Sequence, residues 1–424
     1  MITLHPGLQA ARATEFQIVL DRALQAGCTV VNEPAARNEA PAADLVLDAL
    51  LGLGANRPLS PAISTAVEMI NAHPAPCLSI DVPTGLHADT GQALGGGLIK
   101  ARATLALITL KPGLFMGQGR DAAGRIWLDP LDALPQEPSH PPVAWTTWVA
   151  AGPGAMTQRP HASHKGRFGD VVLVGGAPGM AGALRLSTHA ALAAGAGRVI
   201  AAPLDPTAPL ADTSRPECMW TRPQDLDITA LKRSTVVCGC GGGSAVDEWI
   251  GPLLTHAWRL VLDADALNAL ARDPSLVSAL QDRAESGRTT VLTPHPLEAA
   301  RLLGVGTPYI QGDRLSAAQR LSCRYRATVL LKGSGTVIAS PGRLPEVNLT
   351  GNAALSTGGT GDVLAGWIGG LWASSGPAPQ SESDTAHRMA CTGAFIHGRA
   401  ADRRGSHRAL RALDLVEQMH QWAA

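Results

Sequence analysis

A glycine-dense turn near the carboxyl end of the chain, at residues 351–366, leads directly into a helical pattern. Backbone N–H groups at a helix start, together with the positive end of the helix dipole, hold phosphate charge. Asp362 falls in the first turn, where it can act as a general base on a hydroxyl group. The structural alternative is a glycine-rich helix start that Asp362 merely caps. We favour phosphate binding, because such glycine density weakens a helix start unless the chain gains something else.

A second glycine-rich turn begins at Lys332, directly after an apolar strand pattern at residues 328–331. A lysine beside a flexible glycine loop can meet a phosphate that backbone N–H groups also cradle. A tight β-turn without a ligand is the alternative. The position after a buried strand favours the approach of a nucleotide to the backbone.

Polar residues follow two further strand patterns. His295 lies between two prolines after residues 290–292, and Asp263 and Asp265 follow residues 260–262. Polar groups at the carboxyl ends of parallel strands are where α/β sheets bind ligands. In this arrangement we favour a ligand role for His295 over a structural one. The two aspartates either hold magnesium-bound phosphates or cap the following helix.

These groups need a scaffold, and the apolar runs around them predict a predominantly parallel sheet with crossover helices. A helix of small residues is expected at 181–195. The expected strands of this second segment lie at residues 170–176, 199–202, 235–238, 260–262, 290–292 and 328–331.

The first segment also alternates helix and strand patterns. Asp81 ends a strand there and is followed by a turn, again a position where α/β sheets bind ligands. The expected helices lie at residues 13–26 and 61–72, and the expected strands at residues 28–31, 44–50 and 77–80.

The chain has 424 residues, too many for one ordinary core, which predicts two domains. A proline-rich stretch that cannot sustain a helix predicts a linker at 135–148, between domains at 1–134 and 149–424. A formal charge of zero without a block of Lys or Arg disfavours nucleic acid and anionic membranes and favours a small-molecule ligand. No secretory signal or long apolar run is present, which predicts a cytoplasmic protein.

The seven cysteines are scattered through apolar segments, so we interpret them as buried thiols. Cys238 and Cys240 flank Gly239 in a glycine-rich turn after a strand. A metal or redox role for this pair is the less favoured alternative.

Taken together, the motifs of the second segment resemble the ADP/ATP-dependent NAD(P)H-hydrate dehydratase family, which has a ribokinase-like α/β fold. The first segment resembles the NAD(P)H-hydrate epimerase domain, a Rossmann-like three-layer α/β domain that is often fused ahead of the dehydratase. The motifs of the second segment are His164-Lys165-Gly166, 175–183, 263–268, 293–296, 332–336 and 352–366, and those of the first are 48–54, 81–86, 100–104 and 111–114. The whole chain therefore resembles a bifunctional nicotinamide-nucleotide repair enzyme.

The resemblance implies that the second domain dehydrates the S-epimer of hydrated NADH or NADPH, using magnesium and converting ADP to AMP or ATP to ADP, with release of phosphate. The first domain would interconvert the R- and S-hydrates with the help of potassium. Assembly into a homo-oligomer is also implied, while the preferred nucleotide and the number of subunits stay open.

Site residues carry over by motif. Asp362 would be the catalytic base and would also contact the hydrated cofactor. The residues implied to contact the adenine nucleotide are Lys332, Gly333, Ser334, Gly335, Thr336 and Gly361. The other residues implied to contact the hydrated cofactor in the second domain are Ala183, Gly241 and His295. In the first domain, potassium would lie near Asp48 and Thr84, and substrate near Gly52, Leu53, Gly54, Ala55, Asn56, Arg57, Pro58 and Asp81.

The sequence departs from the families at three points. An Asn-rich, Gly-rich loop that precedes the first motif in the epimerase family is absent, so the first domain is expected to lack its N-terminal part. Arg102 stands where an acidic residue is usual, and residues 239–243 read Gly-Cys-Gly-Gly-Gly where Gly-Pro-Gly-Leu-Gly is usual. Two other functions stay open: a ribokinase-like kinase of a small alcohol or vitamin, and a non-catalytic sensor of adenine nucleotides.

Overall fold

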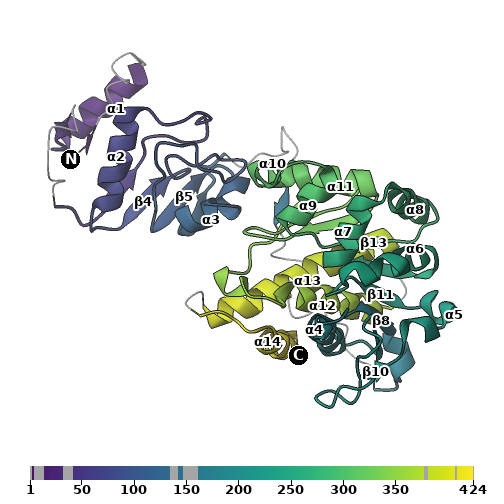
Figure 1. Ribbon diagram of the computed structural model, residues 1–424. Helices are drawn as coiled ribbons and strands as arrows, with labels where there is room; N and C mark the ends of the chain where they lie inside the picture. The colour runs from purple at the N-terminus through teal and green to yellow at the C-terminus, as the bar shows by residue number, and fades with distance from the viewer. Residues whose placement is uncertain are drawn as a thin grey trace. The chain divides into compact units, whose positions relative to one another are not determined.

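The computed structural model (Figure 1) describes residues 2–3, 14–31, 42–133, 142–146, 161–376, 381–405 and 408–423. The chain divides into two compact units, Met1–Ser139 and His140–Ala424. Each unit has apolar clusters of its own and a mainly parallel sheet with helices, so both belong to the expected α/β class. Among the described helices, none combines the length and apolar character needed to cross a membrane.

The first unit is built on a four-stranded parallel sheet in the order β3-β4-β5-β6. Helix α2 begins at Pro61. Proline suits the first helical position, because it has no backbone N–H group and the N–H groups there lack helical partners. Its residues Ile63 and Val67 form one apolar cluster with Cys77 and Ile99. The elements are β1 (Ile2–Thr3), α1 (Thr14–Gln25), β2 (Val30–Val31), β3 (Val46–Asp48), α2 (Pro61–Ala72), β4 (Cys77–Ile80), β5 (Ala103–Leu107), η3 (Pro112–Phe115), α3 (Gly119–Ala122) and β6 (Arg125–Asp129).

The second unit contains a ten-stranded sheet in the order β10-β9-β8-β11-β12-β13-β14-β15-β16-β7. Its central strands are short apolar runs, buried along their whole length, as expected for a parallel sheet covered on both faces. All six strand patterns predicted for this segment form strands. The strands are β7 (Trp145–Thr146), β8 (Asp170–Gly175), β9 (Arg198–Pro203), β10 (Met219–Trp220), β11 (Thr235–Cys238), β12 (Arg259–Leu262), β13 (Thr290–Leu292), β14 (Thr328–Leu331), β15 (Val337–Ala339) and β16 (Glu346–Val347).

One edge of this sheet breaks the parallel pattern. Strand β15 runs antiparallel to both β14 and β16, and β16 pairs in parallel with β7. Residues 135–148, the predicted linker, are described only at 142–146, and Trp145 and Thr146 within that range belong to the sheet of the second unit.

Helices cover both faces of the large sheet (Figure 1). On one face α12 packs against α4, α13 and strands β8, β11 and β12, and on the other α11 packs against β14 and β15. The helices are α4 (Ala181–Ala193), α5 (Ile228–Leu231), α6 (Asp247–His256), α7 (Ala264–Arg272), α8 (Pro274–Glu285), α9 (Pro296–Leu303), α10 (Thr307–Gly312), α11 (Arg314–Tyr325), α12 (Thr360–Ser374), α13 (Glu382–Arg404) and α14 (Ala412–Ala423).

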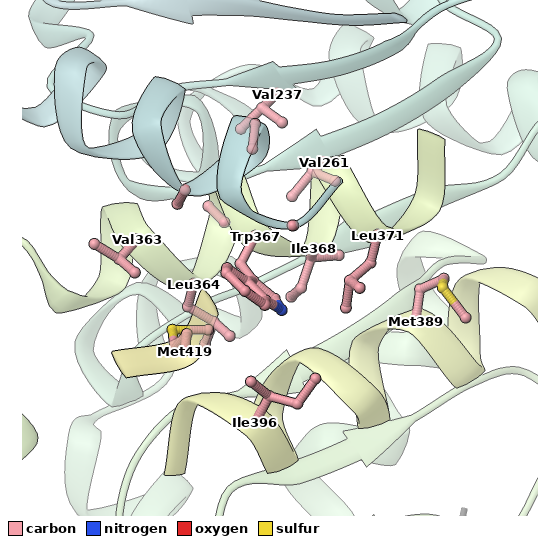
Figure 2. Close-up of a cluster of buried hydrophobic side chains, with 14 of the residues drawn as sticks. Val237, Val261, Val363, Leu364, Trp367, Ile368, Leu371, Met389, Ile396 and Met419 are labelled. Carbon is pink, nitrogen blue, oxygen red and sulfur yellow. The ribbon is translucent and has the colours of Figure 1, made fainter. Parts of the chain in front are cut away.

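Helix α12 runs through the centre of the core and is apolar on every side (Figure 2). Trp367 and Ile368 of this helix are fully buried, in one cluster with Val237 and Val261 of the sheet. A helix that is apolar all round is stable only when it is enclosed. The start of α12, which carries Asp362, is therefore fixed by a deeply packed element.

Two glycines let α12 approach α4 closely. A Cβ atom added at Gly366 would lie 2.0 Å from the carbonyl oxygen of Ser187, and one added at Gly370 would lie 2.3 Å from that of Ala191. Backbone atoms cannot rotate away as a side chain can, so any larger residue forces the helices apart. The seam between α4 and α12 thus depends on the absence of side chains.

We expect Gly366→Ala to lower the free energy of unfolding by about 2 to 3 kcal/mol, because the added methyl group overpacks the seam. Urea unfolding followed by circular dichroism measures the change. Gly182→Ala is the matched control, because Gly182 lies in α4 with no atom within 4 Å of an added Cβ. The control should be neutral or slightly stabilising, since alanine favours helix. Equal stability of the two variants would contradict the close-packed seam.

The predicted burial of the cysteines holds for five of the seven. Cys77, Cys218, Cys238, Cys240 and Cys391 are buried, while Cys28 is half-buried and Cys323 is exposed. Cys323 lies on α11, whose outer face meets solvent, and an apolar sequence neighbourhood does not reveal which face of a helix a residue occupies.

Candidate active site

The predicted site residues of the second unit come from turns that follow neighbouring strands. Strands β8, β11, β12, β13 and β14 are parallel and adjacent, so their carboxyl ends form one edge of the sheet. Asp263 follows β12, His295 follows β13 and Lys332 follows β14. The start of α12 meets this same edge, since an added Cβ at Gly361 would lie 3.3 Å from the ammonium nitrogen of Lys332.

The start of α12 can receive an anion. Its N-cap is Gly359, at a φ of 90°, and no side chain there bonds the first-turn N–H groups. The positive φ favours glycine, and a Cβ added at Gly359 would lie 2.6 Å from Cδ1 of Leu186 and 3.0 Å from the Cβ of Ala412. The buried ring of His397 contacts the carbonyl oxygen of Thr360 at 3.0 Å and helps to hold the turn. A phosphate group placed here would meet N–H donors and the positive end of a 15-residue helix.

Lys332 and Asp263 form a largely buried ion pair at this edge. The ammonium nitrogen lies 2.7 Å from Asp263 Oδ1, and the hydroxyl of Thr293 donates to the same oxygen at 2.7 Å. Burial lowers the pKa of Lys332, but the carboxylates of Asp263 and Glu298 outweigh it and raise the pKa above the usual lysine value. A fixed positive charge therefore stands beside the start of α12.

Asp362 has the properties of a general base. Burial, followed by the nearby charge of Asp263, raises the pKa of its carboxyl group to about 6, while Cys240 and Lys332 act in the opposite direction. A carboxylate with a pKa near the working pH accepts a proton more readily than an ordinary aspartate does. A group of this basicity beside the start of α12 is chemically suited to the base role predicted for Asp362.

His295 has a structural role that its sequence context did not reveal. Its Nδ1 atom accepts from the backbone N–H groups of Leu297 and Glu298, and Glu298 accepts from the His295 N–H at 2.8 Å, which forms a capping box at the start of α9. Burial and the neighbouring Lys332 lower the pKa of His295, so the ring is neutral. With Nδ1 occupied, Nε2 is the ring atom left to meet a ligand or the Glu298 carboxylate at 3.3 Å.

Glu298 was missed by the sequence reasoning. It is buried, and burial raises its pKa to about 7, although Lys332 lowers it. The H-x-x-E spacing at the start of a helix resembles a capping box, a signal that could have identified this residue. Its carboxyl group adds a further acid to the edge that carries Lys332, Asp263 and Asp362.

Arg314 organises the predicted nucleotide-binding turn. This fully buried guanidinium donates to the carbonyl oxygens of Leu331, Lys332 and Gly335 at 3.0 to 3.3 Å. Gly333 has a φ of 136°, and an added Cβ there would meet the guanidinium at 3.0 Å. The hydrogen bonds of Arg314 thus fix the backbone of the turn at residues 332–336. A local sequence pattern could not show this, because Arg314 lies in α11.

The predicted contacts at Ala183 and Gly241 also come together. Gly241 has a φ of 59°, and an added Cβ would lie 2.9 Å from the Cβ of Ala183. Asp265, in the first turn of α7, accepts from the Gly243 N–H at 2.8 Å. Asp263 and Asp265 therefore do different things: the first pairs with Lys332, and the second fixes the glycine-rich turn after β11.

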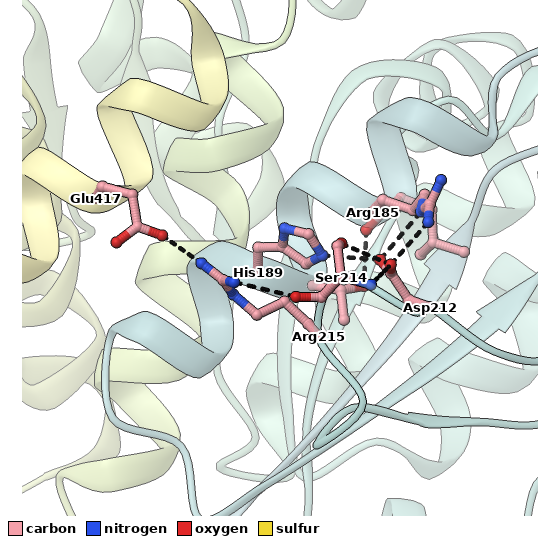
Figure 3. Close-up of polar contacts among 8 residues, drawn as sticks. Arg185, His189, Asp212, Ser214, Arg215 and Glu417 are labelled. Atoms are coloured by element: carbon pink, nitrogen blue, oxygen red, sulfur yellow. Dashed lines mark hydrogen bonds and ion pairs between the residues drawn. The ribbon is translucent and has the colours of Figure 1, made fainter.

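A polar network anchors the helix that carries Ala183 (Figure 3). The fully buried carboxylate of Asp212 accepts two hydrogen bonds from Arg185 of α4, at 2.7 and 3.0 Å, and contacts His189 Nε2 at 2.8 Å. The N–H and hydroxyl groups of Ser214 donate to the same carboxylate. These hydrogen bonds, of which that from Arg185 has the largest effect, hold the pKa of Asp212 far below its usual range.

Another cluster of metal-ligand types lies away from this edge. Glu346, His387 and Cys391 offer ligand atoms within 4.8 Å of one another. Both ring nitrogens of His387 already have partners, namely Ser340 at 2.8 Å and Glu346 at 3.1 Å. Ser340 in turn contacts Thr328, the first residue of β14, so the cluster is a hydrogen-bonded network at the amino end of the strands.

In the first unit, the two residues predicted to lie near potassium are in direct contact. The fully buried Asp48 accepts from the Thr84 hydroxyl at 2.6 Å, from the Thr84 N–H at 2.9 Å and from the Ser79 hydroxyl at 2.7 Å. The carbonyl oxygen of Leu51 lies 3.4 Å from the same hydroxyl. All of these side-chain and carbonyl atoms are oxygens, the donor type that hard cations prefer.

Asp81 lies beside this oxygen cluster and pairs with Lys111. The ammonium group of the buried Lys111 donates to Asp81 and to the carbonyl oxygen of Leu107. Asp81 has a φ of 71°, a strained conformation of the kind found at functional sites. An added Cβ at Gly52 would meet Asp81 Oδ2 at 3.3 Å. The loop of predicted substrate contacts, 53–58, continues from Gly52 and is mostly exposed.

The comparisons with known proteins match both units. Residues 171–421 match the family model described as NAD(P)H-hydrate dehydratase, and residues 9–113 match the YjeF-related protein N-terminus. A bifunctional NAD(P)H-hydrate repair enzyme of Escherichia coli (strain K12) is 37% identical over 405 residues, covering 89% of this chain and 71% of that protein. An ADP-dependent (S)-NAD(P)H-hydrate dehydratase of Neisseria meningitidis is 41% identical, covering 59% of this chain and 82% of that protein.

The solved structures agree in fold. A crystal structure of the ADP/ATP-dependent NAD(P)H-hydrate dehydratase from Bacillus subtilis, co-crystallised with ATP and Mg²⁺, superposes with a TM-score of 0.51 at 25% identity, covering 66% of this chain and 96% of that one. A ribokinase-like superfamily protein of Enterococcus faecalis gives the same TM-score and covers 63% of this chain and 91% of that one. The ribokinase-like fold expected for the second unit is confirmed.

The polar network around Asp212 leads to a prediction on stability. We expect Asp212→Asn to lower the free energy of unfolding by about 2 kcal/mol, because the substitution removes the charged acceptor of Arg185, His189 and Ser214 and turns an amide NH₂ group toward these donors, while the half-exposed Arg185 regains water. Urea unfolding at neutral pH measures the loss. Asp414→Asn is the control: its partner Arg411 is exposed, so little change is expected. A loss no larger than that of the control would contradict the anchoring role.

Proposed function

The chain belongs to the family of bifunctional NAD(P)H-hydrate repair enzymes, and we propose that its second unit dehydrates the S-epimer of hydrated NADH or NADPH at the expense of ADP or ATP. The products would be NADH or NADPH, phosphate, and AMP or ADP. The single observation that carries this proposal is the convergence of Asp362, Lys332 and the uncapped start of α12 at one edge of the sheet.

The chemistry follows from the leaving group. Hydroxide leaves the hydrated ring poorly, whereas phosphate leaves readily, so the hydroxyl oxygen must first be phosphorylated. Asp362 would take the hydroxyl proton as the oxygen attacks the terminal phosphorus, and the bond to the nucleotide's bridging oxygen would break. The N–H groups at residues 359–361 and the ammonium group of Lys332 would stabilise the charge on the transferring phosphoryl group. The C–O bond then breaks, phosphate departs, and loss of a ring proton restores the dihydropyridine.

The residues present suit the implied nucleotide. The Lys332–Thr336 turn presents backbone groups that Arg314 fixes from below, and Gly361 leaves room beside Lys332. Magnesium would enter on the phosphate oxygens and offset their charge during transfer. Ala183 would contact the hydrated cofactor from the start of α4, and Gly241 and His295 would do so from the turns after β11 and β13.

For the first unit we propose epimerisation of the R- and S-hydrates. Potassium would be held by the oxygens around Asp48 and Thr84 and would supply fixed positive charge there. The substrate would lie over the loop from Gly52 to Pro58. Asp81, paired with Lys111, is the titratable group that meets this loop at Gly52.

Mixing the purified chain with chemically hydrated NADH, Mg²⁺ and ADP or ATP should restore the near-ultraviolet absorbance of the dihydronicotinamide. Asp362→Asn should reduce this rate about a hundred- to ten-thousandfold, as expected for loss of a general base, while nucleotide binding measured by calorimetry persists. The same assay tests epimerisation by the first unit. The wild type should rapidly convert both hydrate epimers to NADH, whereas Asp81→Asn should convert only one of them. A stable phosphorylated product would instead identify a kinase, and no turnover by folded protein would refute the repair function.

The raised pKa of Asp362 predicts a pH dependence. The carboxylate acts as a base only when deprotonated, so kcat/KM for the S-hydrate should be constant well above pH 6 and fall to half of its maximum at about pH 6, the pKa of Asp362. Below the midpoint the decrease approaches about tenfold per pH unit. Initial rates in buffers of constant ionic strength give the profile. A midpoint near the ordinary aspartate value would show that burial does not set the basicity of Asp362.

A further inference from the structure

The thiol of Cys240 lies inside the proposed catalytic centre. Its sulfur and the carboxylate oxygens of Asp263 and Asp362 all lie within 4.8 Å of one another. The side chain is almost completely buried, with 2% of its surface exposed. Where the dehydratase family usually has proline, this chain therefore places a hydrogen-bonding group against the residue proposed as the base.

The backbone holds Cys240 in a fixed position. It lies between Gly239 and Gly241, whose φ angles are 115° and 59°, and its carbonyl oxygen accepts from the Gly176 N–H at 3.0 Å. The carbonyl oxygen of Gly241 accepts from Ala177 at 2.7 Å. These bonds tie the turn after β11 to the turn after β8, so the sulfur cannot move away from Asp362 by a shift of the loop.

We propose that Cys240 is a positioning residue for Asp362, whose thiol donates a hydrogen bond to the carboxylate and holds it in the basic, correctly oriented state. The proposal rests on the proposed function, because it assumes that Asp362 is the base. Ser187 of α4 completes the arrangement. Its buried hydroxyl lies near the Cys240 sulfur and has no hydrogen-bond partner among the described residues.

The thiol can only act as a donor here. Burial, followed by the charges of Asp362 and Asp263, raises the pKa of Cys240 well above its usual value, so the proton stays on sulfur. The hydrogen bond in turn lowers the pKa of Asp362, against the larger effect of burial. Hydrogen bonds to a carboxylate stabilise its charged form. Without the thiol, Asp362 would hold its proton to a higher pH.

The other groups that face Asp362 are the same with and without the thiol. The turn after β12 brings Asp263, which disfavours the carboxylate, and the turn after β14 brings Lys332, which favours it. Helix α13 brings His397, whose ring is buried, has a pKa lowered to about 4 by burial, and is therefore neutral. Helix α4 brings the uncharged Ser187. A change at Cys240 alone should thus appear directly in the titration of Asp362.

The test compares pH profiles of kcat/KM for Cys240→Ala, Cys240→Ser and Cys238→Ala. In Cys240→Ala the midpoint should move to higher pH, so that kcat/KM on its acidic side falls about three- to tenfold, the equivalent of one hydrogen bond. The serine hydroxyl can still donate, so Cys240→Ser should recover most of the wild-type profile. Cys238→Ala removes a buried thiol at the end of β11 whose pKa is raised by burial alone, and it should leave the midpoint in place.

Thermal unfolding of each variant shows whether it is folded, and calorimetry with ADP shows whether the nucleotide site is intact. A folded, ADP-binding Cys240→Ala with a wild-type profile would overturn the proposal. The proposal would also be overturned if Cys238→Ala shifted the midpoint as much as Cys240→Ala does, because the loss of packing, and not of the hydrogen bond, would then explain the shift. Absence of turnover in the wild type would instead refute the proposed function, which separates the two failures.

Discussion

The ion pair between Lys332 and Asp263 is the interaction around which the second unit's site is arranged. It joins the ends of β14 and β12 across the intervening strand β13, whose Thr293 donates to the same carboxylate. Two buried charges are stable only when each satisfies the other. The pair thereby holds the turns after β12, β13 and β14 together and places positive charge beside the start of α12. Its two charges also contribute to the unusual pKa values of Glu298 and Asp362.

Much of this arrangement could be predicted from the sequence. The apolar runs at residues 235–238, 290–292 and 328–331 identify strands because each is short, β-branched and followed by a turn. The glycine-rich start of α12 and its Asp362 were recognisable because their spacing is local. The resemblance to the epimerase family also implied that Asp48 and Thr84 lie near one potassium ion, and the strand pattern at residues 290–292 predicted His295 at a strand end.

Contacts between distant parts of the chain were not predictable in this way. Arg314 supports a turn that lies in another element, and nothing in its own surroundings in the sequence shows that it is buried. The contact between Lys332 and Asp263 depends on the order of the strands in the sheet, which a single sequence does not define. The antiparallel β15 and β16 were not among the predicted strands, and β16, with two residues, is too short for a periodic pattern.

The seam between α4 and α12 has a consequence for how this protein can diverge. Gly366 and Gly370 bring the helix of Asp362 onto the helix of Ala183, so one contact surface sets the separation of two parts of the candidate site. No substitution at these two positions is neutral, because every other amino acid adds at least a methyl group to the contact surface. Changes in substrate preference would therefore have to arise in the surrounding loops, where residues can vary without altering the distance between the two helices.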